Sequence, residues 1–198
     1  ARVMSDPQVR RLLWAPLAVC TVDHLVPACE SLRGGRQIAP LLRLLGSDLV
    51  LDELDDYDIE DLPALSRLVF FAGMYGARVV LSSATMPPAL VDGMFRAYQA
   101  GRREWSRNRG PSAGREDGPV EVPCLWVDEL VRPQTVPCAD PGAFSAAHAR
   151  FVEQRVARLQ EQKPLRIARL HRLEATPGRK REEICRQFAA EIGRAAFD

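Results

Sequence analysis

The first hundred residues alternate short apolar runs with segments of helical spacing. The runs Leu17–Cys20, Leu49–Leu51 and Val79–Leu81 lack polar alternation, so each is interpreted as a strand. Uninterrupted apolar strands are typical of a parallel sheet that is covered on both faces. Between them, helices are predicted over Val22–Leu32 and Leu62–Tyr75. The strand–helix–strand order implies right-handed crossovers and predicts an α/β doubly wound layer.

The second hundred residues continue with fewer strands and more helix. A helix is predicted after Pro87 and Pro88, and a Pro-rich connection separates the next strand from a long amphipathic helix. No internal repeat is found. The further elements expected, in chain order, are a mobile loop over Gly110–Pro119, a strand over Val120–Val127, helix Phe144–Gln162, strand Leu165–Leu170 and helix Lys180–Ala190.

Composition and charge indicate an ordinary globular protein. Hydrophobic residues make up 46% and charged residues 27% of the 198 residues, and the net charge is +1. Residues 1–100 hold 9 basic and 12 acidic side chains, whereas residues 101–198 hold 18 and 14. No apolar run reaches the roughly 20 residues of a membrane span, and the charged amino-terminal residues do not resemble a signal peptide. Five cysteines without C-x-x-C spacing favour a reducing cytoplasm over a zinc site or a disulfide framework.

Polar residues follow two of the predicted strands directly. Asp52, Glu53 and Asp55 come after Leu49–Leu51, and Ser83 and Thr85 come after Val79–Leu81. The crevice beyond the carboxyl ends of parallel strands is where open α/β sheets bind ligands. Carboxylates placed there can hold Mg²⁺ on nucleotide phosphates, and a neighbouring carboxylate can deprotonate an attacking water.

Each of these motifs has a plainer interpretation when it is taken singly. Acidic residues after a strand often cap a helix or face solvent in a turn, and Ser-Ala-Thr alone is weaker still. Their joint occurrence, at two strand ends separated by one crossover, favours a functional site.

The residues resemble those of a known family. Asp52-Glu53-Leu54-Asp55 and Ser83-Ala84-Thr85 are similar to motifs II and III of superfamily-two DExD/H helicases. The segment Cys20–Leu25 and the acidic residues Asp56–Asp61 are similar to the helicase-nuclease of type I CRISPR systems, subtype I-F, over about Leu17 to Gln162. The resemblance implies an incomplete RecA-like (P-loop NTPase-type) parallel sheet with helices on both faces. Residues 1–128 would be the carboxyl-terminal part of the first RecA-like domain, and residues 129–198 a mostly helical extension toward the second.

The resemblance also implies roles for single residues. Asp52 would hold the Mg²⁺ of MgATP, and Glu53 would be the catalytic base for water. Asp55 would link the site to the partner domain, while Ser83 and Thr85 would couple hydrolysis to strand movement. Thr21 falls where the family contacts the backbone of single-stranded nucleic acid, and a helix N-cap is its other interpretation.

Several parts of such an enzyme are missing from the sequence. It contains no G-x-x-x-x-G-K-[ST] loop to cradle phosphates, so this chain alone should not hydrolyse ATP. The family's metal-dependent nuclease domain would lie elsewhere, because His24, His148 and His171 have no metal-ligand spacing. The chain is therefore interpreted as a segment of a larger protein, an ATP-dependent single-stranded-DNA translocase of CRISPR interference. Its implied partners are single-stranded DNA, an RNA-guided CRISPR surveillance complex and CRISPR adaptation proteins, with no membrane.

Two alternative functions, and two interpretations of one basic stretch, stay open. The two motifs would also suit another superfamily-two enzyme, such as an RNA helicase, or a non-catalytic helicase-like docking module. The basic stretch with Arg102, Arg103 and Trp105 could grip phosphates and stack a base. The favoured interpretation of this stretch is a solvated helix end that leads into a flexible loop.

Overall fold

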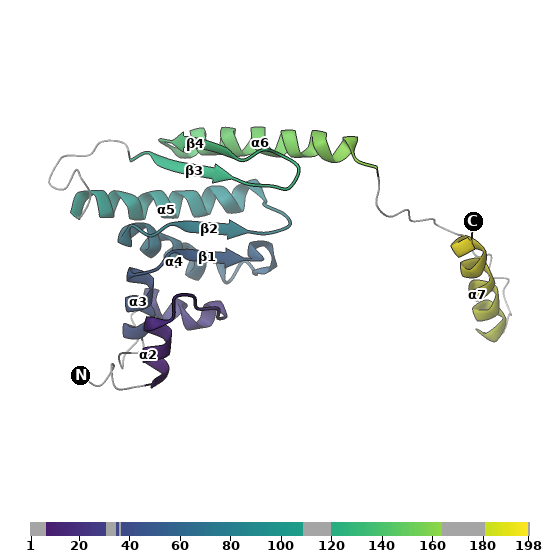
Figure 1. The fold of residues 1–198 in the computed structure, drawn as a ribbon, viewed down its shortest axis with the longest axis horizontal. Helices are drawn as coiled ribbons and strands as arrows, with labels where there is room; N and C mark the ends of the chain where they lie inside the picture. The colour runs from purple at the N-terminus through teal and green to yellow at the C-terminus, as the bar shows by residue number, and fades with distance from the viewer. Residues whose placement is uncertain (1–6, 31–34, 36, 109–119, 164–180, 198) are drawn as a thin grey trace. The chain divides into compact units, whose positions relative to one another are not determined.

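The computed structural model describes residues 7–30, 35, 37–108, 120–163 and 181–197 as a mixture of helices and short strands (Figure 1). They form two compact units, Ala1–Arg158 and Leu159–Asp198. None of the described helices is long and apolar enough to cross a bilayer. In chain order the elements are α2 (Pro7–Trp14), 3-10 helices η1 (Val22–His24) and η2 (Val26–Cys29), α3 (Ile38–Leu45), β1 (Leu49–Asp52), 3-10 helix η3 (Leu54–Asp56), α4 (Leu62–Tyr75), β2 (Val79–Ser82), α5 (Pro88–Asn108), β3 (Val122–Trp126), β4 (Gln134–Cys138), α6 (Pro141–Glu161) and α7 (Arg181–Phe197).

The β1–α4–β2 crossover is the centre of the first unit. β1 and β2 pair in parallel, with Leu49 opposite Val79 and Asp52 opposite Ser82, as the strand–helix–strand pattern predicted. Leu49 and Leu51 point into a core with Leu65 and Leu68 of α4 and are at most 5% exposed. This parallel pair and its helix are compatible with an incomplete α/β fold.

The expectation that both faces of these strands are covered is wrong for the described residues. Val50 and Val80, which are register partners, are 61% and 50% exposed. Side chains alternate across a strand with a period of two, so only the face carrying Leu49 and Leu51 packs on α4. The apolar character of the other face is therefore not explained by contacts among the residues that the structure describes.

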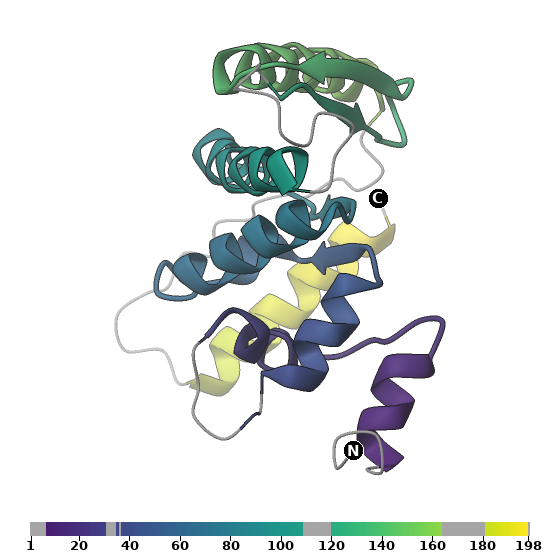
Figure 2. The same ribbon diagram turned by 90° about the vertical axis from the view of Figure 1, so that its left-hand side faces the viewer.

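Two glycines bring α4 and α5 into backbone contact. A Cβ atom added to Gly73 would lie 2.5 Å from the Tyr98 carbonyl oxygen, and one added to Gly101 would overlap the Phe70 carbonyl oxygen. Helices normally keep their axes 8–10 Å apart, and residues without a side chain allow the closest approach. α5 thus lies directly on α4, with the β3–β4 hairpin and α6 on its other side (Figure 2).

A second core joins α5 to the hairpin and to α6. β3 and β4 are antiparallel, and Val122 and Cys138 face each other within the core. The rings of Phe95 and Phe144 stack at 4.4 Å, and the Trp126 ring N–H donates to His148 Nδ1 at 3.2 Å.

One buried amide joins the two ends of the hairpin to α5. Gln99 is 2% exposed, and its Nε2 donates to the carbonyl oxygens of Val120 at 3.1 Å and Ala139 at 2.7 Å. Both hydrogens of the amide nitrogen are therefore used. Burial of a polar side chain is tolerated here because its donors have partners.

Three sequence-based expectations are corrected. Leu17–Cys20 is not a strand, and Leu17 and Val19 are 77% and 90% exposed. Val22–Leu32 is not one helix: two 3-10 helices replace its described part, and Pro27 lies in the second. The Pro-rich connection after β3 contains β4, in which the exposed Pro137 lies at a position that still allows pairing with β3.

The predicted helices over Leu62–Tyr75, after Pro88 and over most of Phe144–Gln162 are confirmed, as is the strand within Val120–Val127. α7 confirms a helix beginning near Lys180. The expected loop Gly110–Pro119 and strand Leu165–Leu170 lie outside the described residues. The division at residue 128 concerns the longer polypeptide and stays a prediction.

Candidate functional site

Two carboxylates lie exposed at the carboxyl end of β1. Asp52 is the last residue of the strand and Glu53 follows it, and both side chains face solvent. Glu53 has φ 52° and ψ 49°, so its backbone is left-handed. It is the only non-glycine residue with positive φ in the described part of the chain. Residues with a Cβ atom rarely adopt this conformation, and those that do are concentrated at functional positions. Glu53 is therefore a candidate functional residue on geometric grounds.

The chain turns at Glu53 and is anchored immediately afterwards. Leu54 is 0% exposed and belongs to the core beneath β1 and α4. The Asp56 N–H donates to the Glu53 carbonyl oxygen at 3.0 Å and closes the 3-10 turn. The turn therefore places Glu53 outside the core, Leu54 inside it, and Asp55 at the edge of the sheet.

Asp55 connects this turn to the end of the neighbouring strand. Its Oδ1 accepts a hydrogen bond from the Ser83 hydroxyl, and its Oδ2 accepts one from the Thr85 hydroxyl. The bond from Ser83, and next the bond from Thr85, lower the pKa of the Asp55 carboxyl from its ordinary value. The structure thus joins the two motifs that the sequence placed at adjacent strand ends.

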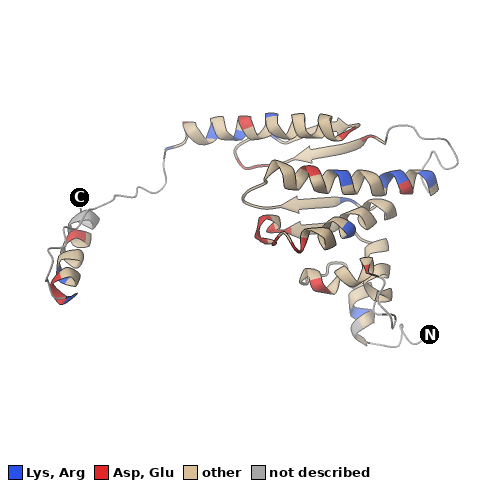
Figure 3. Ribbon diagram, turned by 180° about the vertical axis from the view of Figure 1, so that it is seen from behind, with Lys and Arg blue, Asp and Glu red and all other residues tan. Residues whose placement is uncertain are grey.

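Negative charge is concentrated around this edge. Seven of the ten residues 52–61 are Asp or Glu, and Figure 3 shows them gathered in the turn after β1. Among the described residues, no group of three or more His, Cys, Asp or Glu side chains surrounds one point as a resident metal centre would. Mg²⁺ that arrives with a nucleotide needs only one or two protein carboxylates, since phosphates and waters supply its other ligands. Asp52 fits that requirement, because its carboxylate is exposed and oxygen is the ligand Mg²⁺ prefers.

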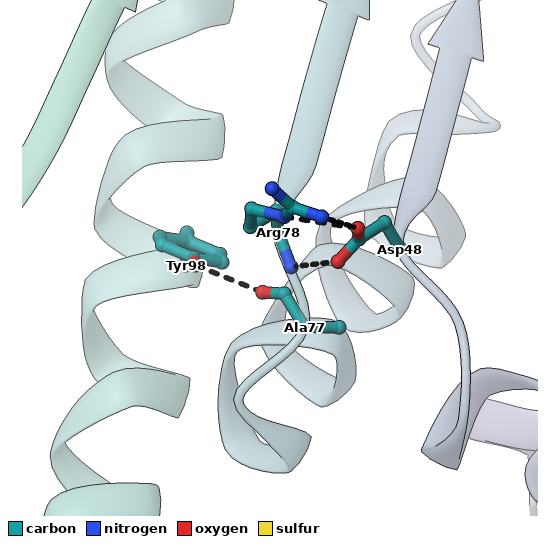
Figure 4. A network of polar contacts seen from close by, with 4 residues as sticks. All are labelled: Asp48, Ala77, Arg78 and Tyr98. Atoms are coloured by element: carbon teal, nitrogen blue, oxygen red, sulfur yellow. Dashed lines mark hydrogen bonds and ion pairs between the residues drawn. The ribbon is translucent and has the colours of Figure 1, made fainter.

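The opposite end of the same sheet is closed by an ion pair (Figure 4). Asp48 accepts the Arg78 backbone N–H at 2.8 Å and the Arg78 guanidinium at 2.9 and 2.6 Å. The hydrogen bonds from the Arg78 side chain lower the pKa of Asp48. Beside them, the Tyr98 hydroxyl donates to the Ala77 carbonyl oxygen at 2.9 Å. This end of the sheet is held together by contacts within the chain, although the Arg78 side chain is 85% exposed.

Arg102, Arg103 and Trp105 lie near this closed end. Trp105 packs on Gly76, where an added Cβ would be 2.5 Å from the indole nitrogen, and Gly76 precedes β2. The Arg102 guanidinium lies 4.1 Å from the Trp105 ring centroid, and Arg103 Nη2 is 3.4 Å from Gln99 Oε1. These contacts do not bring the three residues to the edge that carries Asp52, and their predicted role with nucleic acid stays untested.

Thr21 is exposed and occupies the N-cap position of η1 without capping it. Its side chain makes no bond to the backbone of the helix, and its hydroxyl lies 3.1 Å from His24 Nδ1. No hydrogen bond or ion pair found in the described residues links it to the edge carrying Asp52. Its predicted contact with a nucleic-acid backbone is not tested by these contacts.

Sequence reasoning missed the residues that anchor the two ends of the sheet. Leu54 was treated only as part of a motif, although an apolar residue between acidic neighbours signals an inward-facing position. Asp48 and Arg78 each precede a strand by one residue and carry opposite charges. In paired parallel strands that placement would have indicated their contact.

Comparison with known proteins gives the family. No family model matches the chain. The CRISPR-associated nuclease/helicase Cas3 of subtype I-F/YPEST from Pseudomonas aeruginosa is 54% identical over 182 residues, 92% of this chain and 16% of the relative. The protein of the same description from Pectobacterium atrosepticum is 45% identical over 194 residues, 98% of this chain and 17% of the relative. The chain spans about a sixth of the length of these relatives. The resemblance drawn from the motifs is thus confirmed, and the chain corresponds to a segment of the subtype I-F CRISPR-associated nuclease/helicase family.

Proposed function

We propose that this chain is part of an ATP-dependent helicase motor that translocates on single-stranded DNA in CRISPR interference against foreign DNA. A nuclease domain with its own divalent metal would lie elsewhere in the longer polypeptide. One observation carries the proposal: Asp52 and Glu53 are exposed at a strand end, and their neighbour Asp55 is bonded to Ser83 and Thr85 of the next strand end. The two relatives, both described as CRISPR-associated nuclease/helicases, support it.

In this proposal Glu53 acts as the general base of ATP hydrolysis. Its carboxylate accepts a proton from a water molecule as the water oxygen attacks the γ-phosphorus. The bond between the γ-phosphorus and the bridging oxygen breaks, and ADP leaves. Its solvent exposure at the carboxyl end of a parallel strand gives Glu53 access to a ligand in the crevice.

Asp52 would bind Mg²⁺ that accompanies the nucleotide. Bound there, Mg²⁺ would neutralise charge on the β- and γ-phosphates. The excess of carboxylates around Asp52 would otherwise repel a nucleotide, so binding of ATP requires this cation or nearby basic residues.

Asp55, Ser83 and Thr85 would couple hydrolysis to movement. Their hydrogen bonds connect the turn that carries Glu53 to the segment after β2. A change at the nucleotide can reach that segment by altering which groups the two hydroxyls bind. In a complete motor, such changes would open and close two RecA-like domains along the DNA strand. We place Thr21 among the contacts to the strand and assign docking on an RNA-guided surveillance complex to the longer protein.

The proposal is tested by Glu53→Gln in the longer polypeptide that contains this chain. Loss of the base should lower the turnover number for ATP by roughly a hundredfold or more. Glu60→Gln is the matched control, because Glu60 is an exposed carboxylate in the same acidic turn. Unchanged turnover in Glu53→Gln would favour a non-catalytic docking module.

The nucleic acid is tested separately with the unmodified longer polypeptide. Its ATP hydrolysis is measured with single-stranded DNA, with RNA of the same sequence and with neither. We expect stimulation by DNA. Stimulation by RNA alone would identify a different superfamily-two activity.

A further inference from the structure

The left-handed backbone at Glu53 is fixed from both sides. Before it, Asp52 is held in the sheet opposite Ser82. After it, Leu54 is fully buried, and Asp55 is bonded to the end of the next strand. Glu53 itself is exposed, and its carbonyl oxygen accepts the hydrogen bond from the Asp56 N–H that closes the turn. Its unusual φ is therefore imposed by its neighbours.

The two anchors after Glu53 differ in what they determine. The Asp55 bonds run through a flexible carboxylate to two hydroxyls, which can rotate and exchange partners. Leu54 is held by close packing in the core with Leu51 and Leu68, where displacement would leave a void. The position of the Leu54 backbone, and with it the direction in which the chain leaves Glu53, is set by this packing.

We propose that Leu54 is a positioning residue that holds the Glu53 carboxylate in its reactive orientation through the left-handed turn. This rests on the proposed function, in which Glu53 is the base. If the Leu54 side chain is shortened, the 3-10 turn loses its anchor and Glu53 relaxes toward the negative φ that residues with a Cβ atom prefer. The carboxylate then leaves the position from which it reaches the attacking water, while the nucleotide still binds.

The test compares two equally buried leucines of one core in the longer polypeptide. Leu54→Ala and Leu68→Ala remove the same atoms from residues that are both 0% exposed, and Leu68 lies in the middle of α4 away from the turn. Amide hydrogen exchange of the peptide covering α4 measures the loss of packing, and single-turnover ATP hydrolysis measures the chemical step. We expect similar losses of exchange protection in both variants. The rate of single-turnover ATP hydrolysis should be lower in Leu54→Ala than in Leu68→Ala by about tenfold or more, with KM for ATP unchanged.

Two additional variants make the outcome decisive. Leu54→Met keeps the volume and should restore the rate. In a Glu53→Gln background, Leu54→Ala should have no further effect on the rate, because the group through which it acts is gone. If Leu54→Ala does not fold, Leu54→Val and Leu68→Val provide the same comparison with a smaller loss of volume.

The outcomes separate this inference from the proposed function. If Glu53→Gln abolishes hydrolysis but Leu54→Ala and Leu68→Ala have equal rates, the positioning role is wrong and the proposed base stands. The positioning role is also overturned if Leu54→Ala lowers the rate of ATP hydrolysis by the same factor in the Glu53→Gln background as in the unmodified polypeptide. If Glu53→Gln hydrolyses ATP normally, both conclusions fail.

Discussion

The two ends of the β1–β2 sheet are both held by an aspartate, but the aspartates have different partners. At the amino end, Asp48 receives three hydrogen bonds from Arg78, two of them from a positively charged side chain. At the carboxyl end, Asp55 receives one bond each from the hydroxyls of Ser83 and Thr85. Charged partners make a fixed clamp, whereas neutral hydroxyls can be exchanged at lower cost. One end is built to stay closed, and the other can change its bonds.

The two ends of the sheet also differ in their contents: the amino end holds packing contacts, and the carboxyl end holds the candidate catalytic residues. The amino end uses Ala77, Tyr98 and Trp105 for contacts within the chain. The carboxyl end leaves Asp52 and Glu53 exposed and keeps Glu53 in a left-handed conformation. Strain at one end is tolerated because the rest of the crossover is well anchored.

The largest expected effect comes from a change that damages both ends together. In Gly101→Ala the new methyl group would overlap the Phe70 carbonyl oxygen and force α5 away from α4. We expect a loss of about 3 kcal/mol in the free energy of unfolding, measured by chemical denaturation. Gly93→Ala is the control in the same helix, since its Cβ would meet nothing within 4 Å. It should be neutral or stabilise by up to about 1 kcal/mol. Equal destabilisation by both would refute the backbone contact.

The next effect should appear only at the carboxyl end. Asp55→Asn keeps the shape but replaces one acceptor oxygen by an NH₂ group, so Ser83 and Thr85 can no longer both donate to it. ATP hydrolysis by the longer polypeptide should fall on the order of tenfold, the usual consequence of losing a charge-assisted hydrogen bond. The unfolding midpoint should hardly move. A large fall in the midpoint with normal hydrolysis would reverse the roles assigned to the two ends.

A smaller effect is expected at the amino end. Asp48→Asn removes the charge that faces Arg78, whose side chain is 85% exposed, so solvent already weakens the pair. The midpoint of thermal unfolding should fall by about 2 °C, with ATP hydrolysis unchanged once the protein is folded. Reduced hydrolysis by folded protein would contradict the passive role of this end.

The smallest effect is the response to acid and salt. The pKa of both Asp48 and Asp55 is lowered from its ordinary value of 3.8. Each therefore contributes stability that is present above pH 3.8 and lost as the pH falls through the lowered value. Of the contacts at the two ends of the sheet, salt at about 1 M should weaken the Asp48–Arg78 pair, since its attraction is screened, and should affect the bonds from neutral hydroxyls to Asp55 less. The stability difference between the unmodified chain and Asp48→Asn at pH 7 should shrink in salt, and an unchanged difference would rule out an ionic clamp.

The local pattern of apolar and polar residues predicted the parts of this fold whose contacts are close in sequence. The apolar runs ending at Leu51 and Leu81, with helical spacing between them, were sufficient for the β1–α4–β2 crossover. Leu17–Cys20 has an equally apolar run but makes no strand, because a strand requires a pairing partner that a local pattern does not reveal. β4 was missed for the opposite reason, since the partner β3 allows pairing despite Pro137.

The candidate site was predictable in composition but not in geometry. The motifs gave Asp52, Glu53, Asp55, Ser83 and Thr85, and the parallel register brings the last three together. Nothing in the residue types indicates a left-handed backbone at a glutamate, because that conformation is imposed by the burial of the next residue. The roles of Asp52 and Glu53 with a nucleotide stay predictions.

Gln99 has a consequence for how the second core opens. Its single amide nitrogen bonds the carbonyl groups that flank the β3–β4 hairpin, 19 positions apart in the chain. The entry and exit of the hairpin therefore cannot be released from α5 one at a time without leaving a buried donor unpaired. The hairpin should detach in one cooperative event, so its slowest amide protons would exchange with solvent at a common rate.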